Sequence, residues 1–289
     1  MKRRSFHAWA ALTLAVAGRP ALALEAGDAD AFGAIERSVA GRLGVCAYDL
    51  ETGRSLGHRQ DERFAMCSTF KWLLAAAVLA RVDRGQERLE RRIVFGREAL
   101  LEYAPTTSRH AGGAGMTVAE LCEAALTLSD NTAANLLLDT LGGPGGLTAW
   151  VRTLGDRTTR LDRREPDLNE ARPGDERDTT TPAAMVLALR QAVFGGALSR
   201  RGGDLLLQWM TASTTGLKRL RAGFPPDWRV ADKTGTGAQG TTHDVAVVWA
   251  PGRAPLLLAA YLTESQAPIE AREAALARVA ARVKLGLIG

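Results

Sequence analysis

The sequence Ser68-Thr69-Phe70-Lys71 places a hydroxyl and an amine three residues apart, at the start of a predicted helix. The run that follows, residues 72–80, is apolar and rich in helix-forming residues. Three residues are nearly one helical turn, so Ser68 and Lys71 share a face. A serine becomes a good nucleophile when a neighbouring base or fixed cation activates it. Serine and lysine are common residues, so about one such pair is expected by chance in a chain of this length.

The N-terminal residues 1–23 have the three-part pattern of an export signal. A twin-arginine sequence, Lys2-Arg3-Arg4, precedes an apolar stretch at residues 8–18 and a small-residue cleavage site at residues 21–23. The alternatives are a signal for the general secretory route and a disordered basic N-terminus. We expect export to the periplasm by the twin-arginine route.

Composition restricts the function classes. The chain has 289 residues, 46% of them hydrophobic, which is enough for a buried core. The formal net charge of +5 falls to +1 without residues 1–23, because that segment holds four basic residues and no acid. The sequence contains no basic stripe interleaved with aromatic residues, so we expect no nucleic-acid partner. No later apolar stretch is long enough to span a membrane, so we expect no stable membrane association.

Three cysteines, Cys46, Cys67 and Cys122, lie outside the predicted signal. Their spacing is not that of a zinc site, and we expect neither a metal nor a cofactor. An odd number in an exported protein leaves at least one free thiol. All three are interpreted as small buried apolar residues.

The hydrophobic pattern predicts strands at both ends of the chain and helices between them. Strands are expected at residues 45–50, 55–59, 229–233, 245–249 and 256–262. Helices are expected at residues 29–40, 117–128, 133–141, 181–195, 204–210 and 268–285. We predict an α/β plus all-α fold, in which an antiparallel sheet is flanked by terminal helices. The sheet domain spans residues 24–60 and 212–289, and an all-helical domain, residues 61–211, is inserted between its N- and C-terminal strands.

A polar stretch without predicted secondary structure, residues 163–178, lies within the helical domain. Irregular segments of this length are uncommon in compact domains and are often functional, so we predict an Ω-loop. Arg163 and Asp178 stand at its two ends and are expected to pair. The loop contains Glu165-Pro166-Asp167-Leu168-Asn169. The alternative, a merely solvated charged loop, explains Glu165-Pro166 poorly.

Two further motifs stand where predicted elements begin or end. Ser129-Asp130-Asn131 lies in a short break between two helices, and its simpler interpretation is a capped helix start. Lys233-Thr234-Gly235-Thr236-Gly237 ends a strand, and its simpler interpretation is a glycine-rich turn. The functional interpretation is a strand edge whose N–H groups and cation face a cleft, where glycines let a ligand approach the backbone.

Together these motifs resemble one enzyme family. S-x-x-K, S-D-N and K-T-G are the signature of class A β-lactamases and penicillin-binding proteins, and all three occur here in family order. The E-x-x-L-N sequence from Glu165 to Asn169 resembles the class A hydrolases in particular. The resemblance spans nearly the whole chain after residue 23.

The resemblance implies a role for each matching residue. Ser68 is the nucleophile and Lys71 the lysine beside it, while Ser129 passes a proton to the departing lactam nitrogen. Glu165 and Asn169 position the deacylating water, and the backbone N–H groups of Ser68 and Thr236 form the oxyanion hole. The remaining matches bind substrate: Tyr103 at the rim, Asn131 at the acylamino group, and Lys233, Thr234, Gly235 and Thr236 at the carboxylate. Whether Lys71 or Glu165 is the base for acylation stays open.

The sequence departs from the family pattern at three places. Many relatives carry an arginine on the strand after K-T-G, where this chain has Thr242, and the resemblance implies that Arg219 supplies the guanidinium instead. Some carbapenem-hydrolysing members join the cysteine before the nucleophile to one after K-T-G-T. Here Gly237 occupies that partner site, so Cys67 is expected to form no disulfide. Cys122 matches half of another family disulfide, but Ala75 stands at the partner site.

The expected function is hydrolysis of penicillins and cephalosporins by a periplasmic, monomeric serine β-lactamase. Its partners are small-molecule β-lactam substrates. A D,D-carboxypeptidase or transpeptidase of the same superfamily is the first alternative, and a β-lactam-binding sensor is the second. Glu165 argues against the first, because an acyl-enzyme without a base to activate water persists. The lack of a predicted membrane-spanning segment after the signal argues against both, since sensors of that kind usually carry one.

Overall fold

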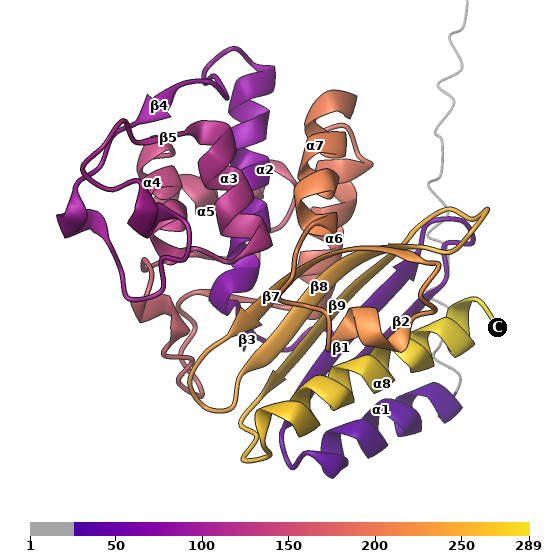
Figure 1. Cartoon of the computed structure of the whole chain (residues 1–289). Helices are drawn as coiled ribbons and strands as arrows, with labels where there is room; N and C mark the ends of the chain where they lie inside the picture. The colour runs from indigo at the N-terminus through magenta and orange to yellow at the C-terminus, as the bar shows by residue number, and fades with distance from the viewer. Residues whose placement is uncertain (1–25) are drawn as a thin grey trace, which may run out of the picture.

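The computed structural model of the protein describes residues 26–289 (Figure 1). The predicted export signal, residues 1–23, lies outside the described residues. Among residues 26–289, no helix is both long and apolar enough to cross a membrane.

A five-stranded antiparallel sheet joins the two ends of the chain. Its strands are β1 (Arg42–Asp49), β2 (Ser55–His58), β7 (Arg229–Thr236), β8 (Thr242–Trp249) and β9 (Leu256–Thr263), in the order β2-β1-β9-β8-β7. The early strand β1 pairs along its whole length with the last strand β9, from Arg42 opposite Thr263 to Asp49 opposite Leu256. The fold class predicted from the sequence is confirmed.

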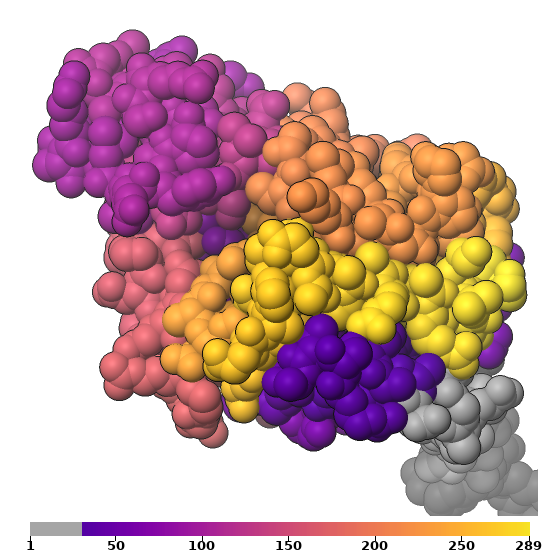
Figure 2. Space-filling view, turned by 60° about the horizontal axis from the view of Figure 1, so that its bottom comes forward, coloured from indigo at the N-terminus to yellow at the C-terminus, as the bar shows by residue number. Residues whose placement is uncertain are grey.

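Helices cover both faces of the sheet. The terminal helices α1 (Ala26–Ser38) and α8 (Ile269–Leu287) pack side by side on one face (Figure 2). Helix α6 (Pro182–Val193) packs on the other face, against β1 and β9. Successive strand side chains point to opposite faces, so Val45 joins the core under α1 and α8 while Cys46 joins the core on the helical side. Because β9 is covered on both faces, all its residues are buried.

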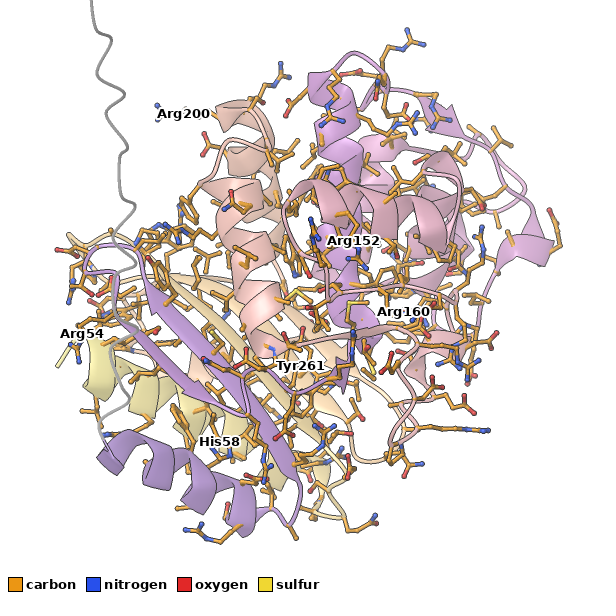
Figure 3. The ribbon with its side chains drawn as sticks, turned by 180° about the vertical axis from the view of Figure 1, so that it is seen from behind. Arg54, His58, Arg152, Arg160, Arg200 and Tyr261 are labelled. Carbon is orange, nitrogen blue, oxygen red and sulfur yellow. The ribbon has the colours of Figure 1, made fainter. Side chains whose placement is uncertain are left out.

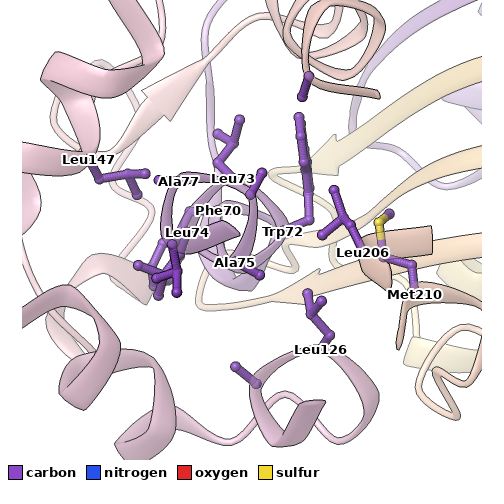
Figure 4. Packing of buried hydrophobic residues seen from close by; sticks show 14 of the residues in the cluster. Phe70, Trp72, Leu73, Leu74, Ala75, Ala77, Leu126, Leu147, Leu206 and Met210 are labelled. Carbon is purple, nitrogen blue, oxygen red and sulfur yellow. The ribbon is translucent and has the colours of Figure 1, made fainter. Parts of the chain in front are cut away.

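Helix α2 (Phe70–Asp83) is the centre of the helical part. Residues 70–80 are all buried, because several other helices pack against α2. Figure 4 shows Leu126, Leu147, Leu206 and Met210 of the neighbouring helices around it. The helices that pack against it are α3 (Val118–Thr127), α4 (Asn131–Thr140), α5 (Pro144–Thr153) and α7 (Arg200–Thr211).

Short elements connect these parts. Two small ladders pair β3 (Phe64–Ala65) with β6 (Thr179–Thr180), and β4 (Arg92–Ile93) with β5 (Met116–Thr117). The 3₁₀ turns are η1 (Cys67–Thr69), η2 (Arg97–Ala99), η3 (Thr107–Arg109), η4 (Asp167–Asn169) and η5 (Leu220–Gly223). We propose the sheet domain at residues 24–60 and 212–289 and the helical domain at residues 61–211. The order of the chain supports this division, since β1 and β2 precede the helices and β7–β9 follow them.

Helix boundaries follow local chemistry closely. The predicted capping box at the start of α3 is present: Thr117 Oγ1 accepts from the Glu120 amide at 3.1 Å, and Glu120 Oε2 accepts from the Thr117 amide at 2.7 Å. Helix α5 is not among the helices predicted from the sequence, because Gly142-Gly143-Pro144 is also the pattern of a helix end. Proline suits the first turn of a helix, and Pro144 begins α5.

The neck of the Ω-loop, residues 163–178, is closed by a buried carboxylate. Asp178 Oδ2 lies 2.6 Å from Arg163 Nε, which confirms the predicted pair. Asp178 Oδ1 also accepts from the backbone amides of Asp162 and Arg163, at 2.7 and 2.8 Å. Asp162 Oδ2 in turn accepts from the Asp178 amide at 2.9 Å, so side chains at both ends of the loop hold its neck closed.

Removal of the Arg163 guanidinium should weaken the contacts that close the Ω-loop. We expect Arg163→Ala to lower the free energy of unfolding by about 3 kcal/mol, because the buried Asp178 carboxylate loses its partner. Urea denaturation measures the change. Arg177→Ala is the matched control, since Arg177 pairs with Asp175 at the exposed surface and should change stability by less than about 1 kcal/mol. Equal losses in the two variants would contradict this assignment.

Candidate active site

One cavity of about 320 Å³ brings the sequence motifs together. It lies where η1, the start of α4, the end of β7 and the Ω-loop meet. The side chains that line it are Ser68, Tyr103, Ser129, Asn131, Asn169, Thr215, Arg219, Thr234 and Thr236. Residues far apart in the sequence therefore share one pocket.

Ser68 lies in the 3₁₀ turn η1, just before the first residue of α2. The Ser68 hydroxyl donates to Glu165 Oε1 at 3.1 Å. The same carboxylate oxygen lies 2.9 Å from Lys71 Nζ. One oxygen atom of Glu165 thus contacts both groups of the S-x-x-K motif.

Lys71 is fully buried, and its ammonium group contacts several of the other predicted site residues. Besides Glu165, its ammonium donates to the Ser129 carbonyl oxygen at 2.8 Å and to Asn131 Oδ1 at 2.6 Å. Burial lowers the pKa of Lys71, while the Glu165 carboxylate acts in the opposite direction. Lys71 therefore gives up a proton more easily than an exposed lysine does.

Glu165 is oriented by two amide side chains. Asn169 Nδ2 donates to Glu165 Oε2, and Asn169 Oδ1 has no hydrogen-bond partner among the described residues. The Glu165-Pro166 peptide bond is cis. Asn135 holds the Glu165 backbone from both sides: its Nδ2 donates to the Glu165 carbonyl at 2.9 Å, and its Oδ1 accepts from the Glu165 amide at 3.1 Å.

Asn135 was not identified from the sequence. Its only local signal is its position one helical turn after Asn131 on α4, which puts both amides on the side of the helix that faces the Ω-loop. The partner, Glu165, is 30 residues away in the chain. An amide that recognises backbone atoms leaves no motif in the sequence around it.

Ser129 lies between two lysines. Its hydroxyl accepts from Lys233 Nζ at 3.0 Å and lies 3.3 Å from Lys71 Nζ. The middle residue of the motif, Asp130, is buried and does not line the cavity. Asp130 caps α4 by accepting from the Ala133 amide at 2.9 Å. The capping interpretation therefore holds for Asp130, while the residues on either side of it line the pocket.

Arg219 reaches the pocket from the turn before η5. Its Nη1 donates to the carbonyl oxygens of Gly235 and His243, both at 2.9 Å, and its Nη2 donates to Thr236 Oγ1 at 2.8 Å. Gly235 and His243 are directly opposite in the β7–β8 ladder, so one guanidinium bridges the two strands. At the position where relatives carry an arginine, the Thr242 hydroxyl accepts from Arg272 Nη1 at 3.0 Å.

Thr215 also lines the cavity and was not identified from the sequence. Its hydroxyl lies 2.7 Å from the Thr234 hydroxyl. Tyr103 stands at the mouth with about half of its surface exposed, and its carbonyl oxygen accepts from the Asn131 amide at 3.0 Å. This backbone hydrogen bond joins the segment that carries Tyr103, at the mouth of the cavity, to the start of α4, which carries Asn131.

The three cysteines are buried and form no disulfide within residues 26–289, as predicted. A Cβ atom on Gly237 would lie 2.7 Å from both Cys67 Sγ and the Asn169 carbonyl oxygen. Glycine at this position therefore lets the end of β7 approach both the nucleophile turn and the Ω-loop. Burial raises the pKa of the Cys67 thiol, so it stays protonated beside Ser68. No group of three or more His, Cys, Asp or Glu side chains suited to a metal ion occurs in the described part of the chain.

Lys233 is buried, and no carboxylate of residues 26–289 contacts it directly, so it should destabilise the fold. Its Nζ donates only to neutral oxygens, those of Ser129 and Thr234. Burial, together with the Lys71 ammonium, holds the pKa of Lys233 well below its ordinary value, although the carboxylates of Asp232 and Asp244 act in the opposite direction. The folded chain binds the Lys233 proton more weakly than the unfolded chain does. The resulting loss of folding stability is therefore complete at pH values below the lowered pKa, and it disappears as the pH approaches the ordinary pKa of lysine.

We expect Lys233→Met to raise the free energy of unfolding at pH 7 by about 1 kcal/mol, because a buried charge is replaced by an apolar side chain. The same variant should lose activity, since the Ser129 hydroxyl loses a donor. Chemical denaturation measures the first effect. The exposed Lys218→Met is the control and should change stability by less than about 0.5 kcal/mol. A clear loss of stability in Lys233→Met would refute the expectation.

Known proteins resemble this chain over nearly its whole length. The profile of the Beta-lactamase enzyme family matches residues 29–285. Beta-lactamase AST-1 of Nocardia asteroides is 49% identical over 258 residues, which are 89% of this chain and 83% of that protein. The carbapenem-hydrolyzing beta-lactamase KPC of Klebsiella oxytoca is 45% identical over 279 residues, 96% of this chain and 94% of that protein.

Solved structures of class A beta-lactamases are also similar to this chain. An ancestral class A beta-lactamase matches with a TM-score of 0.89 and 60% identity, covering 90% of this chain and all of the other. The putative class A beta-lactamase PenP from Rhodopseudomonas palustris matches with a TM-score of 0.88 and 53% identity, again covering 90% of this chain and all of the other. With the serine, two lysines and glutamate linked by polar contacts beside one cavity, these similarities show that the chain belongs to the class A serine β-lactamases.

Proposed function

We propose that this β-lactamase hydrolyses penicillins and cephalosporins through an ester formed on Ser68 and cleaved by water that Glu165 activates. The observation that carries the proposal is the contact of one carboxylate oxygen, Glu165 Oε1, with both Ser68 Oγ and Lys71 Nζ. A serine hydroxyl that donates to a base beside a cation is an activated nucleophile.

In the acylation step, Ser68 Oγ attacks the lactam carbonyl carbon and its proton passes to Glu165 or to Lys71. The backbone N–H groups of Ser68 and Thr236 form the oxyanion hole, which stabilises the negative charge that develops on the carbonyl oxygen. The C–N bond then breaks, and the lactam nitrogen takes the proton of the Ser129 hydroxyl. The two lysines that surround this hydroxyl at 3.0 and 3.3 Å support the role, since either can replace the lost proton.

In the deacylation step, Glu165 takes a proton from a water molecule that attacks the ester carbonyl carbon. Asn169 is adjacent to Glu165, and its free Oδ1 can accept a hydrogen bond from that water. The ester bond to Ser68 Oγ breaks, and the serine recovers its proton. Asn135 supports the step as a positioning residue because it holds the Glu165 backbone.

Substrate recognition uses the cations and hydroxyls on the other side of the cavity. We assign the substrate carboxylate to Lys233, Thr234, Thr236 and Arg219, beside the Gly235 backbone. The short hydrogen bonds that connect these groups support a preformed site. Asn131 binds the acylamino group, and Tyr103 contacts the substrate at the rim.

A single mixing experiment tests the proposal against its alternatives. The chain without residues 1–23 is mixed with a penicillin, and lactam absorbance and protein mass are followed together, with Ser68→Ala as the inactive control. Many turnovers per molecule with unmodified protein at the end are expected. A long-lived adduct after a single turnover would instead indicate a sensor or a penicillin-binding protein.

We also propose that residues 1–23 direct export to the periplasm by the twin-arginine route, where the chain acts as a monomer. The sequence Lys2-Arg3-Arg4 supports the route. Replacing both arginines by lysine should abolish resistance in living cells without changing the activity of the purified enzyme. Undiminished resistance would show that the general secretory route, or none, is used.

A further inference from the structure

The turn that presents Ser68 is conformationally strained. The residue before the nucleophile, Cys67, has a φ of +43°, a left-handed conformation that side-chain-bearing residues rarely adopt. Such a conformation costs about 1–3 kcal/mol and persists only where the surroundings hold it. The groups that hold η1 therefore affect where the Ser68 amide points.

A chain of hydroxyl groups holds this turn from inside the protein. Thr69 Oγ1 donates to the Met66 carbonyl oxygen at 2.7 Å and lies 3.1 Å from the Tyr261 hydroxyl. A hydroxyl has one proton, and that of Thr69 is used on Met66, so Tyr261 must be the donor to Thr69. The Thr69 amide donates to the same Met66 oxygen at 3.1 Å. The order of donation, from Tyr261 through Thr69 to Met66, closes the turn around Cys67 and Ser68.

Tyr261 is itself fixed. It comes from β9, is fully buried, and lies where the sheet meets the helical part (Figure 3). Its ring is 5.9 Å from that of Phe64 and 4.6 Å from that of His243, tilted in both cases. Burial lowers the pKa of His243 to about 3, and its Nδ1 accepts from the Leu262 amide at 3.1 Å, so a neutral imidazole covers the tyrosine.

Strand β7 packs against the other side of the same turn. A Cβ atom on Gly235 would lie 2.9 Å from the Met66 carbonyl oxygen and 3.1 Å from the Thr69 methyl carbon. Thr69 is therefore held between Tyr261 of β9 and Gly235 of β7, and the residue after Gly235 is Thr236. Thr69 therefore lies where the turn that carries Ser68 meets the strand that carries Thr236, and its hydroxyl is the group that connects this turn to Met66 and Tyr261.

We infer that Tyr261 and Thr69 are positioning residues that hold the Ser68 amide in line with the Thr236 amide and so set the geometry of the oxyanion hole. Neither side chain lines the cavity. This inference rests on the proposed function, in which those two amides stabilise the developing oxyanion.

The test compares variants that remove one hydroxyl. In Tyr261→Phe and Thr69→Val, we expect kcat/KM for a penicillin to fall about tenfold with little change in KM, because the transition-state contact is misplaced. Affinity for a boronic acid, which forms a tetrahedral adduct on Ser68 with an oxygen in the oxyanion hole, should fall by a similar factor. Thr69→Ser keeps the hydroxyl and should stay within about twofold of the parent enzyme. The double variant should be no worse than about twofold below Thr69→Val, since the hydroxyls act as one chain.

Thr263→Val is the matched control. It removes another buried hydroxyl pair of β9, with Thr241 at 2.9 Å, and that pair does not touch η1. We expect it to lower the melting temperature and leave kcat/KM and boronic acid affinity unchanged. The inference is wrong if Tyr261→Phe behaves in the same way, or if Thr263→Val weakens boronic acid binding as much. Failure of the parent enzyme to turn over would instead overturn the proposed function, whatever the variants do.

Discussion

Replacement of Glu165 by glutamine is expected to lower kcat on the order of a thousandfold and to leave the protein as a penicilloyl ester on Ser68. Glutamine has nearly the same shape, and its amide cannot take a proton from water. The ester therefore forms and is not hydrolysed. Mass spectrometry of the quenched mixture should show a stable adduct, and rapid mixing should show one burst of lactam opening per molecule.

Asp167→Asn is the control for this prediction. It makes the same carboxylate-to-amide change two residues later in the same loop, at an exposed position outside the cavity. Its kcat should stay close to that of the parent enzyme. The burst also separates the two candidate bases for acylation, because a slow burst in Glu165→Gln indicates Glu165 and a fast one indicates Lys71. Unchanged turnover in Glu165→Gln would refute the assigned deacylation step.

Replacement of Lys71 by methionine should remove activity at an earlier step. We expect acylation to slow by about a thousandfold, so that no adduct accumulates on Ser68. Stability should fall as well, by about 3–5 kcal/mol, because Glu165 stays buried without its ion-pair partner. Mass spectrometry and urea denaturation measure the two effects separately.

The double variant Lys71→Met/Glu165→Gln distinguishes the two losses. With both charges removed, most of the lost stability should return, since no unpaired charge remains buried. Activity should not return, because nucleophile activation and deacylation both need the charged groups. If stability does not recover, the loss in Lys71→Met comes from packing and not from the ion pair.

Much of the fold followed from local patterns. The Thr117 capping box predicted the start of α3, and alternation in the terminal strands predicted a sheet built from both ends of the chain. The prediction missed α5, because a proline after two glycines is compatible with both the end of one helix and the start of the next. Local sequence does not distinguish these cases, since the difference lies in what the following residues pack against.

Some residues of the candidate site could be predicted from the sequence, and others could be found only in the structure. Ser68, Lys71, Ser129, Glu165 and Lys233 could be named from the sequence because each lies in a short motif that resembles the family signature. Asn135 and Thr215 escaped notice because their partners are distant in the chain and are backbone atoms or common hydroxyls. Their importance comes from a contact, and a contact between distant residues has no local pattern.

The sequence by itself determined which chemical groups this protein has: a serine three residues before a lysine, a serine in a helix break, a lysine at a strand end and a glutamate in a polar loop. Helix and strand periodicity also determined the fold class, because both depend on neighbours within one or two turns. Only the tertiary structure decided that Glu165 Oε1 contacts both Ser68 and Lys71, and that Tyr261 holds the nucleophile turn through Thr69. Such contacts depend on how the core brings β7, β9, α2 and the Ω-loop together, and that packing is a property of the whole chain.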